Sequence, residues 1–118
     1  MMKLKVEKKM LANAVSNVLK AVPGKTTMQI LNNILITAIG SEIVLVGNDL
    51  ELGISSSVEG EIVEQGKTTI DARLFSEIVR KLPDGEVSLS VDEKGTATVK
   101  CGKSKFSLAT MDADDFPL

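Results

Sequence analysis

The stretch Thr68–Leu82, T-T-I-D-A-R-L-F-S-E-I-V-R-K-L, predicts a strand that runs directly into a short helix. Asp71 can accept hydrogen bonds from the unpaired N–H groups of the first helical turn, and Pro83-Asp84-Gly85 ends the helix. One face of this helix is apolar at helical spacing and is expected to be buried. Its residues are Phe75, Ile78, Val79 and Leu82. The opposite face is mostly basic.

The same strand-to-helix pattern opens the chain, with a strand at Lys3–Glu7 and a helix at Lys8–Ala21. When Glu7 is aligned with Asp71, the apolar faces of the two helices coincide. Leu11 matches Phe75, Ala14 matches Ile78, Val15 matches Val79 and Val18 matches Leu82, and on the polar side Lys9 matches Arg73. This agreement indicates an internal repeat, which outweighs local evidence in assigning a fold.

Three extended segments follow each helix. They are Ile34–Ile39, Glu42–Val46 and Leu50–Val58 after the first, and Glu86–Val91, Thr96–Cys101 and Ser104–Thr110 after the second. The predicted fold class is therefore α+β: a βαβββ unit written twice, at about residues 3–58 and 67–111, with two helices on one side of antiparallel sheets. All 118 residues are expected to form one domain. Residues 112–118 are acidic and read as the start of an interdomain linker.

Composition excludes several classes of function. The chain has no His, which rules out Ser–His and Cys–His nucleophiles and His-containing metal sites. Its one cysteine, Cys101, cannot form an internal disulfide or a thiolate metal site, and it fits a cytoplasmic protein. No apolar run approaches the length of a membrane span, and the early lysines argue against a signal peptide. We therefore expect no metal, no cofactor and no membrane partner.

Asp49 and Glu51 could be read as a general acid and base, which leaves a small enzyme as a rival interpretation. They alternate with leucines in a segment predicted to be a half-exposed strand, so both should face solvent. Exposed carboxylates of this kind form a solvated face far more often than a catalytic pair, and nothing nearby would tune a pKa. The chain is therefore not expected to be an enzyme, and no catalytic residue is assigned.

The polar faces of the two helices are the better candidate site. The first carries Lys9, Asn13, Ser16 or Asn17, and Lys20, and the second carries Arg73, Arg80 and Lys81, diluted by Glu77. Lysine is the usual occupant of an exposed helix face, so either face alone could simply be solvated. Basic residues at one matched position of both repeats, Lys9 and Arg73, in a chain of net charge −2, favour a shared surface that meets phosphates without reading bases.

Two further features stand out along the chain. The connection after the first helix, Pro23–Asn33, has eleven residues where its repeat counterpart has three, and it carries Lys25. Extra length placed at one point of a repeated unit is often functional. The last strand carries Lys103 and Lys105, which either deter edge aggregation or restrict the partner strand to an acidic one.

Six stretches, in order along the chain, carry a family resemblance. They are K-L-K-V-E-K from Lys3, I-L-N-N-I-L-I from Ile30, V-G-N-D-L-E-L from Val46, D-A-R-L-F-S-E-I-V-R-K-L-P from Asp71, K-S-K-F-S-L-A-T-M from Lys103, and D-F-P from Asp115. With these the whole chain resembles the bacterial DNA polymerase III beta subunit, the sliding clamp, and specifically the first of its three domains. A duplicated βαβββ unit is also what that DNA-clamp fold contains.

The resemblance implies a processivity factor that tethers the replicative DNA polymerase to duplex DNA by encircling it. Two subunits would close the ring, with helices lining the hole, and polymerase and clamp loader would bind through domains absent from this chain. Arg73 and Arg80 match basic residues of a lining helix, and Lys25 matches a DNA-contacting position in the loop after the first helix. Lys9, Asn13, Lys20 and Lys81 join the predicted DNA-binding set through their helix spacing alone.

The resemblance also implies a subunit interface. Lys103, Lys105, Phe106 and Leu108 match the edge strand through which this domain meets the last domain of the partner subunit. We expect the two lysines on one side of Ser104–Thr110 and an apolar patch of Phe106 and Leu108 on the other. Leu74 and Ile78, on the nearest flank of the second helix, would add apolar contact. The alternative is a non-enzymatic protein-interaction domain that uses only this charged edge.

Overall fold

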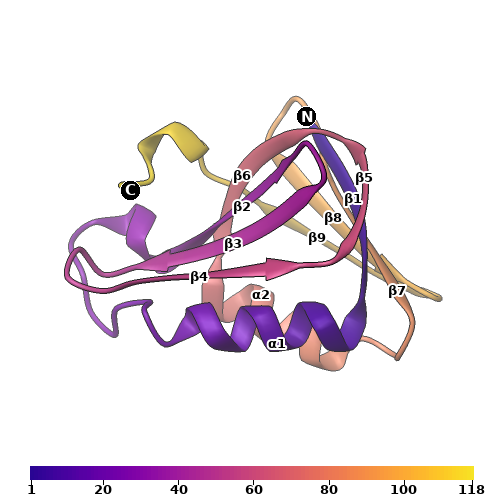
Figure 1. The fold of residues 1–118 in the computed structure, drawn as a ribbon, viewed down its shortest axis with the longest axis horizontal. Helices are drawn as coiled ribbons and strands as arrows, with labels where there is room; N and C mark the ends of the chain where they lie inside the picture. Colours follow the sequence, from indigo (N-terminus) through magenta and orange to yellow (C-terminus); the bar gives the residue numbers. More distant parts are fainter.

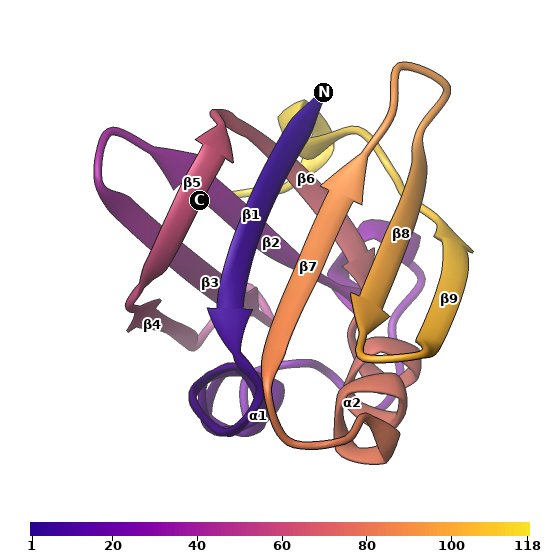
Figure 2. The ribbon, with the colours of Figure 1, turned by 90° about the vertical axis from the view of Figure 1, so that its right-hand side faces the viewer.

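The computed structural model describes residues 1–118 as two antiparallel sheets that face each other, with two helices across one end (Figures 1 and 2). Helix α1 spans Lys8–Leu19 and α2 spans Ala72–Lys81. The strands are β1 (Met2–Glu7), β2 (Asn33–Ile39), β3 (Glu42–Asn48), β4 (Gly53–Val58), β5 (Gly60–Glu64), β6 (Gly66–Asp71), β7 (Glu86–Val91), β8 (Thr96–Cys101) and β9 (Ser104–Ala109). Two short 3-10 helices are η1 (Gln29–Asn32) and η2 (Ala113–Asp115).

The two halves of the chain exchange their first strands. One sheet has the order β5-β1-β7-β8-β9 and the other has the order β4-β3-β2-β6. Strand β1 therefore pairs with β7 from the second half, and β6 pairs with β2 from the first. Both exchanged strands have six residues, and they begin and end at matched positions of the repeat. The predicted α+β fold, built from a duplicated unit, is confirmed.

Each helix begins where an acidic side chain caps its first turn. The Asp71 carboxylate accepts a hydrogen bond from the Leu74 N–H at 2.9 Å, as predicted. The Glu7 carboxylate accepts from the Met10 N–H at 3.1 Å and also from the Lys9 N–H. The eight repeat-matched apolar residues of the two helices are all buried, in one core with the inward-facing residues of both sheets. Neither helix has the length and apolar character that crossing a membrane requires.

The predicted strand Leu50–Val58 was wrong at its start, because the chain turns before β4 begins at Gly53. The Asn48 side-chain oxygen accepts from the Leu50 N–H at 2.6 Å. The Asp49 carboxylate accepts from the N–H groups of Glu51 and Leu52, at 2.9 and 2.6 Å. Asn and Asp favour turns because their side chains supply such local hydrogen bonds. Asp49 and Glu51 therefore lie in a turn and not on a strand face.

Two segments carry more structure than the sequence indicates. Strand β5 lies between the two predicted repeat units, where no strand was predicted, and it pairs with β1. The C-terminal residues, read from the sequence as linker, fold against the four-stranded sheet (Figure 1). There Met111 bridges Thr69 of β6, and Phe116 is buried.

Candidate nucleic-acid interface

Helices α1 and α2 lie next to each other across one end of the molecule (Figure 2). Because both bury the same repeat-matched stripe against the sheets, their opposite stripes point outwards on the same side. We call the exposed side of residues 8–20 and 72–81 the helix face. The structure brings six of the predicted DNA-binding residues to it, all exposed: Asn13 and the five cations Lys9, Lys20, Arg73, Arg80 and Lys81.

The helix face is the positive part of an acidic protein. Residues 8–20 and 72–81 contain six Lys or Arg and one Glu, whereas the rest of the chain contains eight Lys or Arg and fifteen Asp or Glu. The chain has one salt bridge, which joins Lys67 to Asp114 and involves neither helix. No cation of the helix face is therefore held by a carboxylate at ion-pair distance. A surface of this kind attracts phosphate groups from solution.

A hollow of about 180 Å³ lies between the two helices on this face. It is lined by Leu19 and by three repeat-matched pairs: Ala12 with Ser76, Val15 with Val79, and Ser16 with Arg80. Matched parts of the two repeats thus meet at the hollow. Two serine hydroxyls and a guanidinium can donate hydrogen bonds there. Ser76 was not among the predicted site residues. The repeat alignment could have indicated it, because the alignment matches Ser76 to Ala12 one turn before it matches Arg80 to Ser16.

The two predicted residues other than the helix cations, Asn13 and Lys25, have different surroundings from one another. Asn13 lines a second small hollow with Asn17, between α1 and the Ser56–Val58 part of β4. Lys25 is exposed in the loop that joins α1 to η1. Asn13 is also exposed one turn after Lys9 on α1, whereas Lys25 lies outside both helices.

The predicted subunit-interface residues are arranged differently from expectation. Lys103 lies in the turn before β9, so only Lys105 is on the strand, opposite Lys100 of β8. Phe106 is half-buried, and Leu108 is only 8% exposed, because alternate residues of β9 pack inwards on the core. Ile78 is likewise 7% exposed, whereas Leu74 is 46% exposed. The expected apolar patch of Phe106 and Leu108 is therefore part of this chain's own core.

Strand β9 nevertheless ends the five-stranded sheet, with β8 as its one neighbour (Figure 2). An edge strand leaves a row of backbone N–H and C=O groups without partners in the sheet. Lys105, Ser107 and Ala109 are its exposed side chains.

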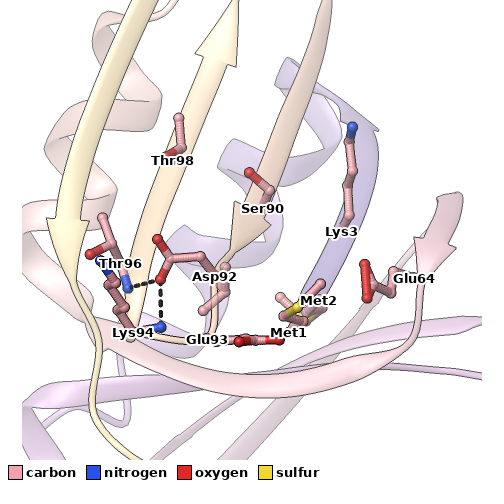
Figure 3. A pocket seen from close by; sticks show the side chains of 11 residues that line it. Met1, Met2, Lys3, Glu64, Ser90, Asp92, Glu93, Lys94, Thr96 and Thr98 are labelled. Atoms are coloured by element: carbon pink, nitrogen blue, oxygen red, sulfur yellow. Dashed lines mark hydrogen bonds between the residues drawn. The ribbon is translucent and has the colours of Figure 1, made fainter.

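A wider hollow of about 520 Å³ lies at the N-terminal end of β1, beside the β7–β8 turn (Figure 3). Its charged lining is mixed: Lys3, Glu64, Asp92, Glu93 and Lys94. The Asp92 carboxylate accepts hydrogen bonds from the N–H groups of Lys94 and Thr96, both at 2.9 Å, and so belongs to the turn. No group of three or more His, Cys, Asp or Glu side chains in the chain could hold a metal ion.

Solved structures identify the class of protein to which this geometry belongs. A protein from Eubacterium rectale, assigned as a DNA polymerase III beta subunit, superposes with a TM-score of 0.98 and 46% identity over 100% of this chain and 32% of that chain. The DNA polymerase sliding clamp of Bacillus subtilis superposes with a TM-score of 0.95 and 34% identity, over 99% of this chain and 33% of that one. The fold is that of a sliding-clamp domain.

Sequence comparison gives the family. Residues 2–118 match the model of the DNA polymerase III beta subunit, N-terminal domain, and the chain belongs to this family. The beta sliding clamp of Staphylococcus epidermidis is 35% identical over 126 aligned positions, which cover 100% of this chain and 33% of that protein. The chain thus spans about a third of the length of such relatives. The family resemblance predicted from the sequence is confirmed.

Proposed function

We propose that this chain serves as the N-terminal domain of a DNA sliding clamp, with the helix face lining the hole through which duplex DNA passes. The observation that carries the proposal is the concentration of unpaired cations on two adjacent helices of an otherwise acidic chain. Duplex DNA is the polyanion that the family relationship points to. Its phosphates attract such a surface whatever the base sequence.

The same chemistry suits movement along DNA. Lys and Arg side chains that contact phosphates position a protein on the duplex but carry no sequence information. Because the phosphates repeat uniformly, the free energy of these contacts is nearly the same at every position along the axis of the DNA duplex. The helix face also offers few side chains at rigid positions that could read base edges in a groove. Weak, uniform contact of this kind allows a ring to slide.

Ring closure in this proposal uses the free edge of β9. A second subunit would add a strand there through the backbone groups that β8 leaves unpaired. Lys105 and the nearby Lys103 would favour an acidic partner, and the exposed Leu74 would add apolar contact. Phe106, Leu108 and Ile78 would act from beneath, because they support β9 and α2 from within the core.

The role of the complete clamp is to hold a replicative polymerase on its template. This proposal assigns no reaction and no cofactor to the chain, and it places polymerase and clamp-loader binding in parts of the clamp outside residues 1–118. The contribution of this chain is one stretch of the ring's lining and one half of a subunit contact.

The test is duplex binding by the 118-residue chain, measured by fluorescence anisotropy over a range of salt concentrations. Binding should be weak, independent of sequence and weaker as salt rises, and removing one phosphate-binding side chain should reduce the slope of log K against log salt by about 0.9. Lys20→Glu with Arg80→Glu should reduce both affinity and slope. Lys3→Glu with Lys94→Glu makes the same change of charge at the N-terminal end of β1, away from the helices, and should have a much smaller effect. Equal reductions in the two pairs would overturn the assignment.

A further inference from the structure

The C-terminal segment, residues 111–118, is bound to the outer side of the four-stranded sheet, and we call it the strap. Met111 and Thr69 exchange both backbone hydrogen bonds, at 3.1 and 3.3 Å. Lys67 of β6 pairs with Asp114 at 3.0 Å. The Asn48 side-chain N–H, at the end of β3, donates to the Pro117 carbonyl at 3.0 Å. The strap is therefore attached at both of its ends, to two different strands.

The strap completes a second apolar cluster, separate from the main core. Its buried members are Ile30 and Leu31 of η1, Leu35 of β2, and Phe116 of the strap. Phe116 is 5% exposed, although it comes from a segment that the sequence marks as acidic and polar. Without the Phe116 ring, the outer sides of η1 and β2 would lose their cover from the strap. This cluster is small, so one aromatic side chain is a large share of its buried surface.

A chain of hydrogen bonds also joins the strap to the start of β2, next to η1. The Thr69 hydroxyl donates to the Met111 carbonyl at 2.9 Å and accepts from the Asn33 side-chain N–H at 3.1 Å. Asn33 directly follows η1 and is itself buried. Buried polar groups that satisfy one another in this way fix the relative position of the segments they join.

The loop that carries Lys25 is held between these two apolar clusters. At its start, Val22 is buried in the main core. At its end, Ile30 and Leu31 are buried in the cluster that Phe116 completes. Between them the Leu31 N–H donates to the Met28 carbonyl at 3.0 Å. The range of positions that Lys25 can reach therefore depends on the packing of η1, to which Phe116 of the strap contributes.

We propose that the strap, through Phe116, holds the Lys25 loop in place beside the helix face, so that Phe116 is a positioning residue for a DNA contact it does not make. The positioning of the loop by Phe116 rests on the packing alone, and the DNA contact of Lys25 rests on the function proposed above. Without Phe116 the loop would stay attached at β2, but its unanchored part would extend through η1 and sample more conformations. Lys25 would then lose conformational entropy when it binds a phosphate. In the anchored loop this entropy has already been lost on folding.

The test of the positioning step is native-state amide exchange in the 118-residue chain. Phe116→Ala should speed exchange at the Leu31 and Met28 amides by about tenfold or more, with Phe116→Leu intermediate, while amides of α2 and β8 change much less. Ile62→Ala removes apolar packing against the main core, on the other sheet, and should not produce this local pattern. Unchanged exchange at Leu31 in Phe116→Ala, or equal acceleration at all sites in both Phe116 variants, would overturn the proposal.

A second arm separates this inference from the function on which it partly rests. Lys25→Gln should weaken duplex binding in the wild-type chain and have a smaller effect in the Phe116→Ala background. If Lys25→Gln has no effect in the wild type, Lys25 does not contact DNA, and the exchange result stands by itself. If it has the same effect in both backgrounds, Lys25 contacts DNA without needing the strap, and the positioning role is wrong.

Discussion

At the scale of single residues, the turn between β3 and β4 shows how side chains override a strand pattern. Leu50 has φ of +79°, and no other residue except glycine has a positive φ. A leucine in this conformation is strained, and it is also 60% exposed, so packing does not compensate. The hydrogen bonds accepted by Asn48 and Asp49 are what hold it there.

The pKa of Asp49 follows from that turn. The N–H groups of Leu52 and then Glu51 donate to its carboxylate and lower its pKa below the usual value. A carboxyl whose pKa is lower in the folded state adds stability that is present above its unfolded pKa of about 3.9 and is lost as pH falls through the folded value. We expect an NMR titration of the Asp49 side chain to give a midpoint below that of a model peptide.

Asp49→Asn provides the matched control for this prediction, because the amide cannot titrate but can still accept hydrogen bonds. The stability difference between wild type and Asp49→Asn should shrink as pH falls through the folded pKa of Asp49. A midpoint at or above the model-peptide value would show that the turn does not favour the ionised carboxylate.

At the scale of elements, the close approach of β3 and α1 depends on a missing side chain. A methyl group built on Gly47 would overlap the Val18 carbonyl oxygen of α1. Gly47→Ala must therefore push α1 away from the sheet, and we expect it to cost about 1–3 kcal/mol or more of unfolding free energy. Gly24→Ala is the control, since an added methyl there meets nothing within 4 Å, and it should change stability by no more than about 1 kcal/mol. Urea denaturation measures both.

The edge strand gives a second prediction at this scale. Lys105 lies opposite Lys100 on the sheet, with Lys103 in the adjoining turn, so two copies of β9 that approach each other bring like charges together. The isolated chain should self-associate weakly, and more tightly near 1 M salt, where the screening length falls to about 3 Å. Lys105→Thr should tighten association roughly threefold to tenfold at low salt, as measured by sedimentation.

Lys94→Thr, which removes the same charge from the β7–β8 turn, should leave this association unchanged. Tighter association at low salt than at high salt in the wild-type chain would contradict the role given to the lysines.

The elements also show what the sequence could and could not predict. The sequence predicts β7 and β8 to the residue, because each alternates cleanly between apolar and polar side chains. It does not reveal β5, because the apolar residues Ile62 and Val63 are adjacent and do not alternate, and because the pairing with β1 defines the strand. The strap resembles a linker in sequence because the pocket for Phe116 is built by η1 and β2, which a local reading of the last residues does not contain.

For the candidate site, the repeat alignment was the informative signal. It matched Lys9 to Arg73, helix spacing added the other cations, and the structure brings them to one face. It could not show that Phe106 and Leu108 are turned into the core, because an apolar residue on an edge strand has the same spacing whether it faces a partner or its own domain. Their part in a subunit interface remains a prediction.

At the scale of the whole molecule, strand exchange makes the halves depend on each other. Residues 1–65 lack β7 as a partner for β1, and residues 66–118 lack β2 as a partner for β6. We expect each fragment alone to give poorly dispersed NMR spectra, and an equimolar mixture to recover the spectrum of the intact chain. Ile70→Asp in the second fragment, which places a charge in the buried face of β6, should abolish that recovery. A cooperative unfolding transition in either fragment alone would contradict the prediction.

The exchange of first strands also has a consequence during synthesis. Glu7 and Glu86 are register partners, so the start of the five-stranded sheet waits for residues made much later. At roughly 5–20 residues per second, a ribosome needs about 4–16 seconds to make the chain between them. During that interval the apolar side of β1, with Met2, Leu4 and Val6, has no completed sheet to enter. We therefore expect the nascent chain to expose this apolar side until β7 is made, and a message truncated before β7 to yield a chain that cannot complete this sheet.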